Sequence, residues 1–421
     1  MNVPVRPGYK PTEVGIVPAD WAVEPLANVA DKITVGIASS ATHAYRRAGI
    51  PLLRNQNIKA GYLDDADVLY VDPEYERIFK NKRLEGGDLL IARTGYPGTT
   101  CVVPSKYASA QSFTTLIVRP KKSKIDSNYL CYYLNSEYGQ NFFEQSQIGG
   151  AQKNVNAGSL KVMPIPVQLL TEQRAIAAAL SDMDALISGL DQLIAKKRDI
   201  KQAAMQQLLT GQKRLPGFSK EWEVKPMRAL GRTYGGLAGK TKRNFGHGDA
   251  RYIPFMNVMT DTVIDPSWLD TVDIAPDEVQ NLAKIGDLFF NGSSETPEEV
   301  GFCSVLLKDI PNLYLNSFCF GFRFNCRAKV NGLFFAYWFR SKSGRTATSV
   351  LAQGATRYNI AKGAFMQLEI PQPSEEEQTA IATILADMDG ELATLKIRCD
   401  KARQIKLGMM QELLTGRIRL I

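Results

Sequence analysis

The chain has 421 residues, of which 44% are hydrophobic and 22% charged, and its formal net charge is +8. This length predicts two or three domains, and the composition excludes a disordered chain, while no apolar run approaches the ~20 residues of a membrane helix. The basic balance favours a polyanionic partner. The start has no signal-peptide pattern, and the scattered cysteines, none of them in a C-x-x-C pair, are typical of reduced thiols in a cytoplasmic protein.

The first segment, residues 1–165, is predicted to be a compact α+β domain. Short β-branched and aromatic runs such as LLIA and TTLIV alternate with turn residues. Polar side chains whose forked or paired groups match base edges in the DNA major groove gather at three places. These candidate DNA-binding residues are Arg54, Asn55, Gln56 and Asn57, then Arg93 and Thr94, then Gln152, Lys153 and Asn154.

The next segment, residues 166–215, is predicted to be one long helix or a closely spaced helix pair. The Ile165-Pro166 pair marks a strand or turn exit before it, and Gly211 provides a C-terminal cap after it. Apolar residues recur at alternating steps of three and four, which is the pattern of a coiled-coil seam. The seam residues are Leu180, Met183, Ile187, Leu190 and Ile194.

The third segment, residues 216–370, is weakly related to the first at a similar offset. GDLLIARTG matches IGDLFFNGSS, and GIPLLRNQNI matches YIPFMNVM. A shared framework with different loops is the pattern expected of one scaffold that reads two sequences. Its candidate DNA-binding residues are Lys240, Lys242 and Arg243, then Asn257, then Asn291 and Ser293, then Arg357 and Asn359.

The last segment, residues 371–421, repeats the first helix. Residues 376–416 align without a gap to residues 171–211, and 20 of the 41 positions are identical. About 40 helical residues span roughly 60 Å, so each apolar stripe needs a cover. We expect the two helices to pack together, antiparallel because a two-fold relation gives that arrangement. The second seam consists of Leu385, Met388, Leu392, Leu395 and Cys399.

Three fragments partly match catalytic motifs, but none meets the requirements of its motif. GGLAGKT at residues 235–241 ends like a Walker A loop, but the required first glycine is replaced by Tyr234. DPSW at residues 265–268 lacks the second proline of a methyltransferase loop, so a plain turn is expected. EVK at residues 223–225 has the spacing of a nuclease carboxylate–lysine pair, but a three-residue pattern of this kind arises by chance in a chain of this length. Six scattered cysteines and two histidines predict no metal site and no histidine-based catalysis.

The order of these parts resembles the specificity subunit of Type I restriction–modification systems along essentially the whole chain. The resemblance rests on GYKPTEVGIVPADW at the start, TEQRAIAAALSDMD, QQLLTGQKRLPGFSKEW, EEQTAIATILADMD and the terminal LLTGRIRL. GIPLLRNQNI and GDLLIARTG are similar to parts of the family's target-recognition domains. IGDLFFNGSSETPEEVGF departs from the usual arginine-glycine loop, which is present as Arg93-Thr94-Gly95.

The resemblance implies two α/β target-recognition domains joined by two long antiparallel helices with pseudo-two-fold symmetry. It also implies a split, asymmetric DNA target in which each domain reads one half. The implied partners are two adenine-N6 methyltransferase subunits and endonuclease–translocase subunits, which would carry S-adenosylmethionine, ATP and Mg. The chain itself is then a non-catalytic subunit of a DNA methylation and restriction system.

Other interpretations remain open from the sequence. The same DNA reader could serve a modification-only adenine methyltransferase. A scaffold whose helices dock partners without specific DNA binding, or a stand-alone methyltransferase or nuclease, belongs to a different class. Any single polar residue named above could also be a solvated loop residue or make a local turn hydrogen bond.

Overall fold

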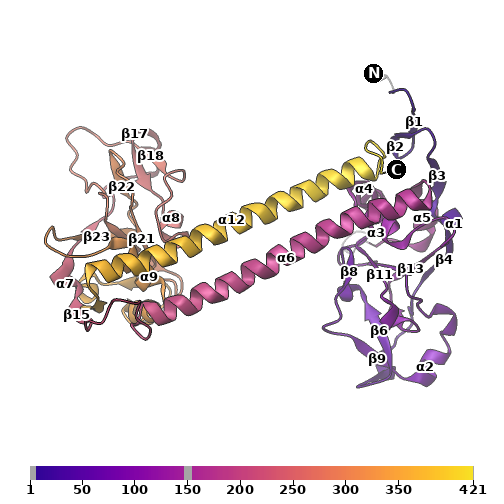
Figure 1. Ribbon diagram of the computed structural model, residues 1–421, viewed down its shortest axis with the longest axis horizontal. Coiled ribbons are helices and arrows are strands. Elements are labelled where there is room, and N and C mark those ends of the chain that lie inside the picture. Colours follow the sequence, from indigo (N-terminus) through magenta and orange to yellow (C-terminus); the bar gives the residue numbers. More distant parts are fainter. Residues whose placement is uncertain (1–5, 147–153, 421) are drawn as a thin grey trace. The chain divides into compact units, whose positions relative to one another are not determined.

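The two duplicated segments each form one continuous helix (Figure 1). Helix α6 covers Leu170–Leu208 and helix α12 covers Glu375–Leu413, so each contains 39 residues. No proline interrupts either segment, which allows the main-chain hydrogen bonds of a helix to continue from end to end. The structure therefore selects a single helix in each copy over the helix pair that the sequence also allowed.

The computed structural model describes residues 6–146 and 154–420. The chain divides into two compact units. Unit 1 contains residues 1–191 and 398–421, and unit 2 contains residues 192–397. Each unit thus combines one mixed α+β body with a part of α6 and a part of α12.

Ion pairs show that α6 and α12 are antiparallel within each unit. In unit 1, Asp184 pairs with Lys406 at 2.6 Å and Asp191 pairs with Arg403 at 2.8 Å, so the numbering rises in one helix as it falls in the other. In unit 2, Lys197 pairs with Glu391 at 2.7 Å, and Lys201 with Asp389 at 2.5 Å. The expected antiparallel packing is confirmed.

The structure buries most of the seam between these helices. Met183, Ile187 and Met388 are half-buried. The other seam positions are buried, namely Leu180, Leu190, Ile194, Leu385, Leu392, Leu395 and Cys399. Apolar side chains at three- and four-residue steps lie on one helix face, and removing that face from water stabilises the pair.

The body of unit 1 is built from two four-stranded sheets. The antiparallel sheet has the order β11-β10-β13-β4, and the mixed sheet has the order β12-β6-β9-β5. Their strands are β4 (Ala30–Val35), β5 (Tyr45–Arg46), β6 (Ile50–Arg54), β9 (Leu69–Val71), β10 (Leu89–Ile91), β11 (Thr100–Val102), β12 (Gln111–Phe113) and β13 (Leu116–Pro120). Three antiparallel pairs of short strands complete the unit. They are β1 (Tyr9–Thr12) with β2 (Gly15–Pro18), β3 (Ala22–Pro25) with β14 (Pro164–Val167), and β7 (Ile58–Lys59) with β8 (Tyr62–Leu63).

The body of unit 2 repeats the antiparallel sheet. The order β16-β23-β19-β21 matches β4-β13-β10-β11 of unit 1 element by element. Its strands are β16 (Gly231–Gly235), β19 (Leu288–Asn291), β21 (Cys303–Val305) and β23 (Cys319–Phe324). The remaining strands are β17 (Phe245–Ile253), β18 (Asp270–Val272), β22 (Leu313–Leu315), β20 (Ser293–Ser294), β24 (Ala352–Gln353), β25 (Tyr358–Ile360), β15 (Glu223–Pro226) and β26 (Glu369–Gln372).

Short helices cover these sheets. In unit 1 they are α1 (Leu26–Val29), α2 (Pro73–Arg77), α3 (Ser127–Asn135), α4 (Glu137–Gln145) and α5 (Ala157–Lys161). In unit 2 they are α7 (Met227–Leu230), α8 (Phe255–Thr260), α9 (Gly332–Arg340), α10 (Lys342–Ser349) and α11 (Lys362–Gln367). Short 3-10 turns are η1 (Thr42–Ala44), η2 (Asn55–Asn57), η3 (Lys80–Lys82), η4 (Ser105–Tyr107) and η5 (Lys242–Asn244). No helix within the described residues is long and apolar enough to cross a membrane.

The segments near the two chain ends meet in unit 1. The Tyr9 hydroxyl donates to the Gly416 carbonyl at 3.0 Å, and Arg419 pairs with both Asp20 and Glu172. In unit 2 the chain is continuous at the corresponding place, where Arg214 pairs with Glu377. The ion pair of Arg214 with Glu377 in unit 2 thus corresponds to that of Arg419 with Glu172 in unit 1. In unit 2 the chain continues past this place, whereas in unit 1 the segments near the two chain ends meet there.

Candidate nucleic-acid interface

Two of the predicted polar clusters of unit 1 come together around one hollow. It has a volume of about 570 Å³. Its polar lining consists of Arg54, Asn55, Gln56, Lys59, Thr94, Tyr96, Thr99 and Thr114. The side chains come from three separate segments, and Asn55 contacts Thr94 across 39 positions of the chain, so the fold creates this arrangement.

Asn55 organises the hollow. Its side-chain oxygen accepts a hydrogen bond from the Arg93 main-chain N–H at 2.8 Å. Its amide nitrogen donates to the hydroxyls of Thr94 and Thr114, each at 3.3 Å. Thr114 has a positive φ of 54°, a conformation that few non-glycine residues adopt. Asn55 therefore connects the loop after β10 to the turn after β12.

The neighbouring side chains of Arg54 and Gln56 form hydrogen bonds with Asp67. The Arg54 guanidinium donates to an Asp67 carboxylate oxygen at 2.8 Å, and the Gln56 amide donates to the same oxygen at 2.7 Å. Arg93 donates through Nε to the Asn154 side-chain oxygen at 2.8 Å. Arg93 and Asn154 are half-buried, so the third predicted cluster also joins this region. Gln152 and Lys153 lie outside the described residues.

The prediction for Asn57 was wrong. Its side chain is only 2% exposed. The amide nitrogen donates to the carbonyls of Asp64 and Asp67, and the oxygen accepts from the Arg54 main-chain N–H. A buried amide with its donors and acceptor satisfied has no group left for a base edge. Asn57 is a structural residue that fixes the loop after β6.

The same correction applies to three residues of unit 2. Asn257 and Asn291 are fully buried, and Ser293 is buried within β20. Asn257 donates to the Asp265 and Trp268 carbonyls at 2.9 and 2.7 Å, and Asn291 donates to the Glu299 carbonyl at 2.8 Å. These side chains tie loops together and are not available to DNA. The predicted plain turn at Asp265 is present, since its carboxylate accepts from the Ser267 main-chain N–H at 2.8 Å.

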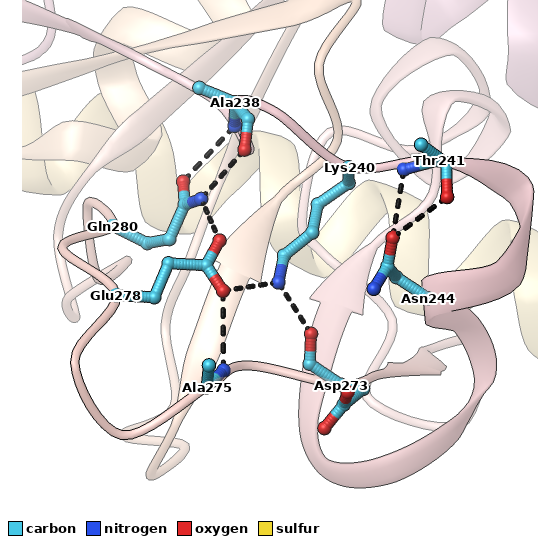
Figure 2. Close-up of polar contacts among 8 residues, drawn as sticks. All are labelled: Ala238, Lys240, Thr241, Asn244, Asp273, Ala275, Glu278 and Gln280. Atoms are coloured by element: carbon cyan, nitrogen blue, oxygen red, sulfur yellow. Dashed lines mark hydrogen bonds and ion pairs between the residues drawn. The ribbon is translucent and has the colours of Figure 1, made fainter.

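The Lys240 side chain also forms its contacts within the protein, as Figure 2 shows. Its ammonium pairs with the Glu278 carboxylate and donates to the Asp273 carbonyl at 2.6 Å. Only 7% of its side chain is exposed. The lysine that ends the Walker-like sequence is therefore neutralised by a carboxylate, and the prediction that it contacts DNA was wrong.

The remaining candidates of unit 2 lie on the surface at two places. Lys242 and Arg243 are exposed in η5. Arg357 is exposed near β25 with its guanidinium 5.4 Å from the centre of the Phe318 ring, and Asn359 is exposed within β25. Within residues 154–420, no hydrogen bond or ion pair connects the η5 turn to Arg357 or Asn359. Unit 2 thus presents two polar patches, whereas unit 1 gathers its candidates around one hollow.

Three positions that the sequence did not single out belong to these surfaces. Tyr96 is 85% exposed between Gly95 and Gly98, both of which have positive φ. Thr114 completes the hydrogen bonds of Asn55, and Phe318 lies under Arg357. A tyrosine in a Gly-Tyr-Pro-Gly sequence is a local signal that would have identified Tyr96. Nothing near Thr114 or Phe318 in the sequence identifies them.

The described residues contain no group of His, Cys, Asp and Glu that could hold a metal ion. Burial raises the pKa of the Cys131 and Cys319 thiols to about 12, so both stay protonated at neutral pH and are poor nucleophiles. His247 contacts the Arg243 carbonyl through Nε2 at 2.7 Å. The chemistry that these surfaces offer is hydrogen bonding and positive charge, which suits the recognition of a nucleic acid.

Comparisons with known proteins agree with this chemistry. The family described as "Type I restriction modification DNA specificity domain" matches residues 18–196 and 283–399. The chain is 25% identical, over an alignment 434 positions long, to the putative type I restriction enzyme MjaX specificity subunit of Methanocaldococcus jannaschii. That alignment covers 98% of this chain and 96% of the relative.

Two solved structures share the fold. The HsdS subunit from Thermoanaerobacter tengcongensis gives a TM-score of 0.50 at 15% identity, covering 96% of this chain and 98% of that one. The S subunit of a Type-I restriction-modification system from M. genitalium gives a TM-score of 0.56 at 14% identity, covering 93% of this chain and 96% of that one. At these identities the likeness concerns the fold.

Proposed function

The chain belongs to the Type I restriction–modification DNA specificity family, and from this premise we propose that its two units read the two halves of one bipartite, asymmetric DNA site. The observation that carries the proposal is a repeated sheet order with different surroundings. Both units contain the same four-stranded antiparallel sheet, but their exposed polar groups differ in kind and place. One scaffold with two sets of contacts is suited to two unlike half-sites.

In this proposal, unit 1 contacts DNA through the region around its hollow. Arginine and glutamine side chains match guanine and adenine edges, whereas phosphate contacts supply affinity and position without sequence information. Arg93, Thr94 and Gln56 are the base-reading candidates, and Asn55 holds Arg93 and Thr94 in place through its hydrogen bonds. In unit 2 the candidates are Lys242, Arg243, Arg357 and Asn359, all of which are exposed.

We also propose that α6 and α12 set the length of the unread spacer. A 39-residue helix is about 58 Å long at 1.5 Å per residue. Two half-sites on one face of DNA lie roughly 34–36 Å apart, which is one helical turn. The antiparallel ion pairs within each unit support a stiff connection, because they fix the register of the two helices.

The partners in this proposal are two adenine methyltransferase subunits and endonuclease–translocase subunits, in the cytoplasm. Leu193 and Ile200 of α6 are exposed and lie seven residues apart, on one helix face of unit 2. An exposed apolar face of this kind favours packing against a partner helix. S-adenosylmethionine, ATP and Mg would then bind to those partners, and this chain would direct their chemistry to a DNA sequence.

Competition binding tests the proposal. The chain is assembled with its methyltransferase subunits, and labelled target DNA is displaced by unlabelled target or by random DNA. We expect target DNA to compete at least ~1000-fold better, the usual lower limit for specific binding. Equal competition by both DNAs would support a scaffold without sequence recognition and would overturn the proposal.

A further inference from the structure

A polar clamp holds one loop of unit 2 in a fixed conformation (Figure 2). The loop runs from β16 to the η5 turn. The Gln280 side chain makes two hydrogen bonds to the main chain of Ala238: its oxygen accepts from the N–H at 3.0 Å, and its nitrogen donates to the carbonyl at 2.8 Å. This two-point contact fixes both the position and the orientation of the peptide at Ala238.

Glu278 is the centre of the clamp. Its carboxylate pairs with Lys240, accepts from the Gln280 amide, and accepts from the Ala275 main-chain N–H at 3.2 Å. The hydrogen bond from Lys240 holds the pKa of the Glu278 carboxyl below its usual value. Lys240 also donates to the Asp273 carbonyl. Three residues of the loop after β18, Asp273, Glu278 and Gln280, are thereby connected to the loop after β16.

The clamp leads directly into the turn that carries positive charge. Thr241 donates to the Asn244 side-chain oxygen through its main-chain N–H at 2.9 Å and through its hydroxyl at 3.0 Å. The Asp273 N–H donates to the Asn244 carbonyl at 2.8 Å. Between these fixed points, Lys242 and Arg243 are exposed. The backbone of the turn is held on both sides, while its two cationic side chains make no hydrogen bond or ion pair to other described residues.

The two units place their cations differently around this turn. The corresponding turn of unit 1 is η1, which also follows the first strand of the antiparallel sheet. Matching main-chain bonds precede the two turns, from Ile37 to Ser112 and from Leu237 to Leu315, both at 2.7 Å. The η1 sequence is Thr-His-Ala, and its nearest cations, Arg46 and Arg47, follow the turn, with Arg46 paired to Asp72. In unit 2 the cations Lys242 and Arg243 lie within the η5 turn itself.

The opposite change occurs in the loop after β10 of unit 1 and its counterpart after β19 of unit 2. In unit 1 this loop carries Arg93 beside the hollow. In unit 2 the corresponding stretch carries Glu295, Glu298 and Glu299, all exposed. Three carboxylates repel a phosphate backbone, so this loop is unsuited to the contact that Arg93 can make. Arg357 is one exposed cation of unit 2, and the η5 turn supplies two adjacent ones, Lys242 and Arg243.

We propose that Lys240, Glu278 and Gln280 are positioning residues that hold Lys242 and Arg243 against the DNA of the second half-site. The inference rests on the proposed DNA reading by unit 2 and adds which loop makes the contact and what holds it. A loop that is already ordered loses little conformational entropy on binding. The clamp therefore raises affinity without touching DNA itself.

The test uses the full complex with its methyltransferase subunits and a target site found by mapping methylated adenines. Glu278→Gln removes the charge that attracts Lys240 and keeps the shape of the side chain. We expect its affinity for target DNA to fall about five- to tenfold and its discrimination against changes in one half-site to weaken. The double variant Lys242→Gln with Arg243→Gln should lower the slope of log affinity against log salt by about 1.8, since each lost phosphate contact contributes ~0.9.

Two further variants keep the result interpretable. Glu223→Gln removes an exposed ion pair with Lys225 in the same unit and should bind like the wild type. Gln280→Leu removes the two hydrogen bonds to Ala238 and leaves the ion pair between Lys240 and Glu278 in place, so it should weaken discrimination in the same direction as Glu278→Gln. If Glu278→Gln and the Lys242/Arg243 variant both bind and discriminate as the Glu223→Gln control does, the inference is overturned. Loss of target preference in the wild-type complex would instead overturn the proposed function.

Discussion

The Asp184 carboxylate in α6 lies 2.6 Å from the Lys406 ammonium in α12. The same carboxylate accepts a hydrogen bond from the Tyr132 hydroxyl at 2.9 Å. In unit 2, Asp389 of α12 pairs with Lys201 of α6 and accepts from the Tyr337 hydroxyl at 2.7 Å. Each residue of the second set is the counterpart, 205 positions away, of one in the first, and the two helices have exchanged roles. Such reciprocity is what a pseudo-two-fold relation produces.

This reciprocal pair predicts a specific stability effect. Lys406→Glu places a second carboxylate beside Asp184 and should lower the free energy of unfolding by about 1 kcal/mol, the upper range for partly exposed pairs. Lys401→Glu makes the same charge change at an exposed position of the same helix and should have a smaller effect. Urea unfolding of both variants measures the difference. Equal losses would show that Asp184 and Lys406 do not interact in solution.

Asn55 offers a test of the hollow in unit 1. Asn55→Ala removes the acceptor for the Arg93 N–H and the donor to two threonine hydroxyls. We expect about tenfold weaker binding of target DNA, because a misplaced base contact costs ~1–3 kcal/mol, with little change for random DNA. Asn128→Ala, at an exposed position in α3, is the control. A uniform loss on both DNAs would point to general unfolding.

Glu76 predicts a pH dependence of stability. It is buried, pairs with Arg83 at 2.6 Å and accepts from the Gln111 amide at 2.8 Å. The Arg83 guanidinium holds the pKa of Glu76 below its ordinary value of 4.5. A lowered folded-state pKa contributes stability that is complete above 4.5 and is lost as the pH falls through the lowered pKa.

Urea unfolding of the free chain between pH 3 and pH 7 measures this effect. Glu76→Gln should cost about 1.5–3 kcal/mol at pH 7, the usual worth of a hydrogen bond to a charged group, and its stability should fall less steeply on acidification than that of the wild type. Glu74→Gln changes an exposed neighbour and should keep the wild-type slope. Identical slopes for all three proteins would rule out Glu76 as a source of the pH dependence.

The helix that joins the units predicts how the spacer responds to length. Four residues inserted beside Leu190 add about 6 Å and about one turn to α6, which corresponds to roughly two base pairs at 3.4 Å each. The spacer in the methylated site should lengthen while both half-sites keep their sequence. The same insertion after Lys122, in an exposed turn, should leave the spacer unchanged. An unaltered spacer in the α6 variant would contradict the measuring role of the helix.

Much of the fold could be predicted from the sequence because its signals are periodic. The seam around Leu180 and Leu385 follows from three- and four-residue steps, and the 205-residue repeat made the pairing of the two helices a simple inference. Strands such as β10 follow from short apolar runs between turn residues. The parallel pairing of β6 with β12 had no such signal, because its partners are far apart in the chain.

The candidate site was less predictable, for a chemical reason. An asparagine side chain presents the same donor and acceptor to an adenine edge and to the main chain of a loop, so Asn57, Asn257 and Asn291 fitted both roles equally well. Burial decides between the roles, and burial depends on the whole fold. Lys240 was misassigned similarly, because Glu278 lies 38 residues away and nothing periodic connects them.

Independent reading of two half-sites is tested most directly by exchanging one domain. Residues 1–165 are replaced by the corresponding segment of another family member, and methylated adenines are mapped by sequencing DNA from cells that contain the complete complex. One half of the target should change to that of the donor protein, while the other half stays as in the wild type. A change in both halves, or in neither, would contradict the account.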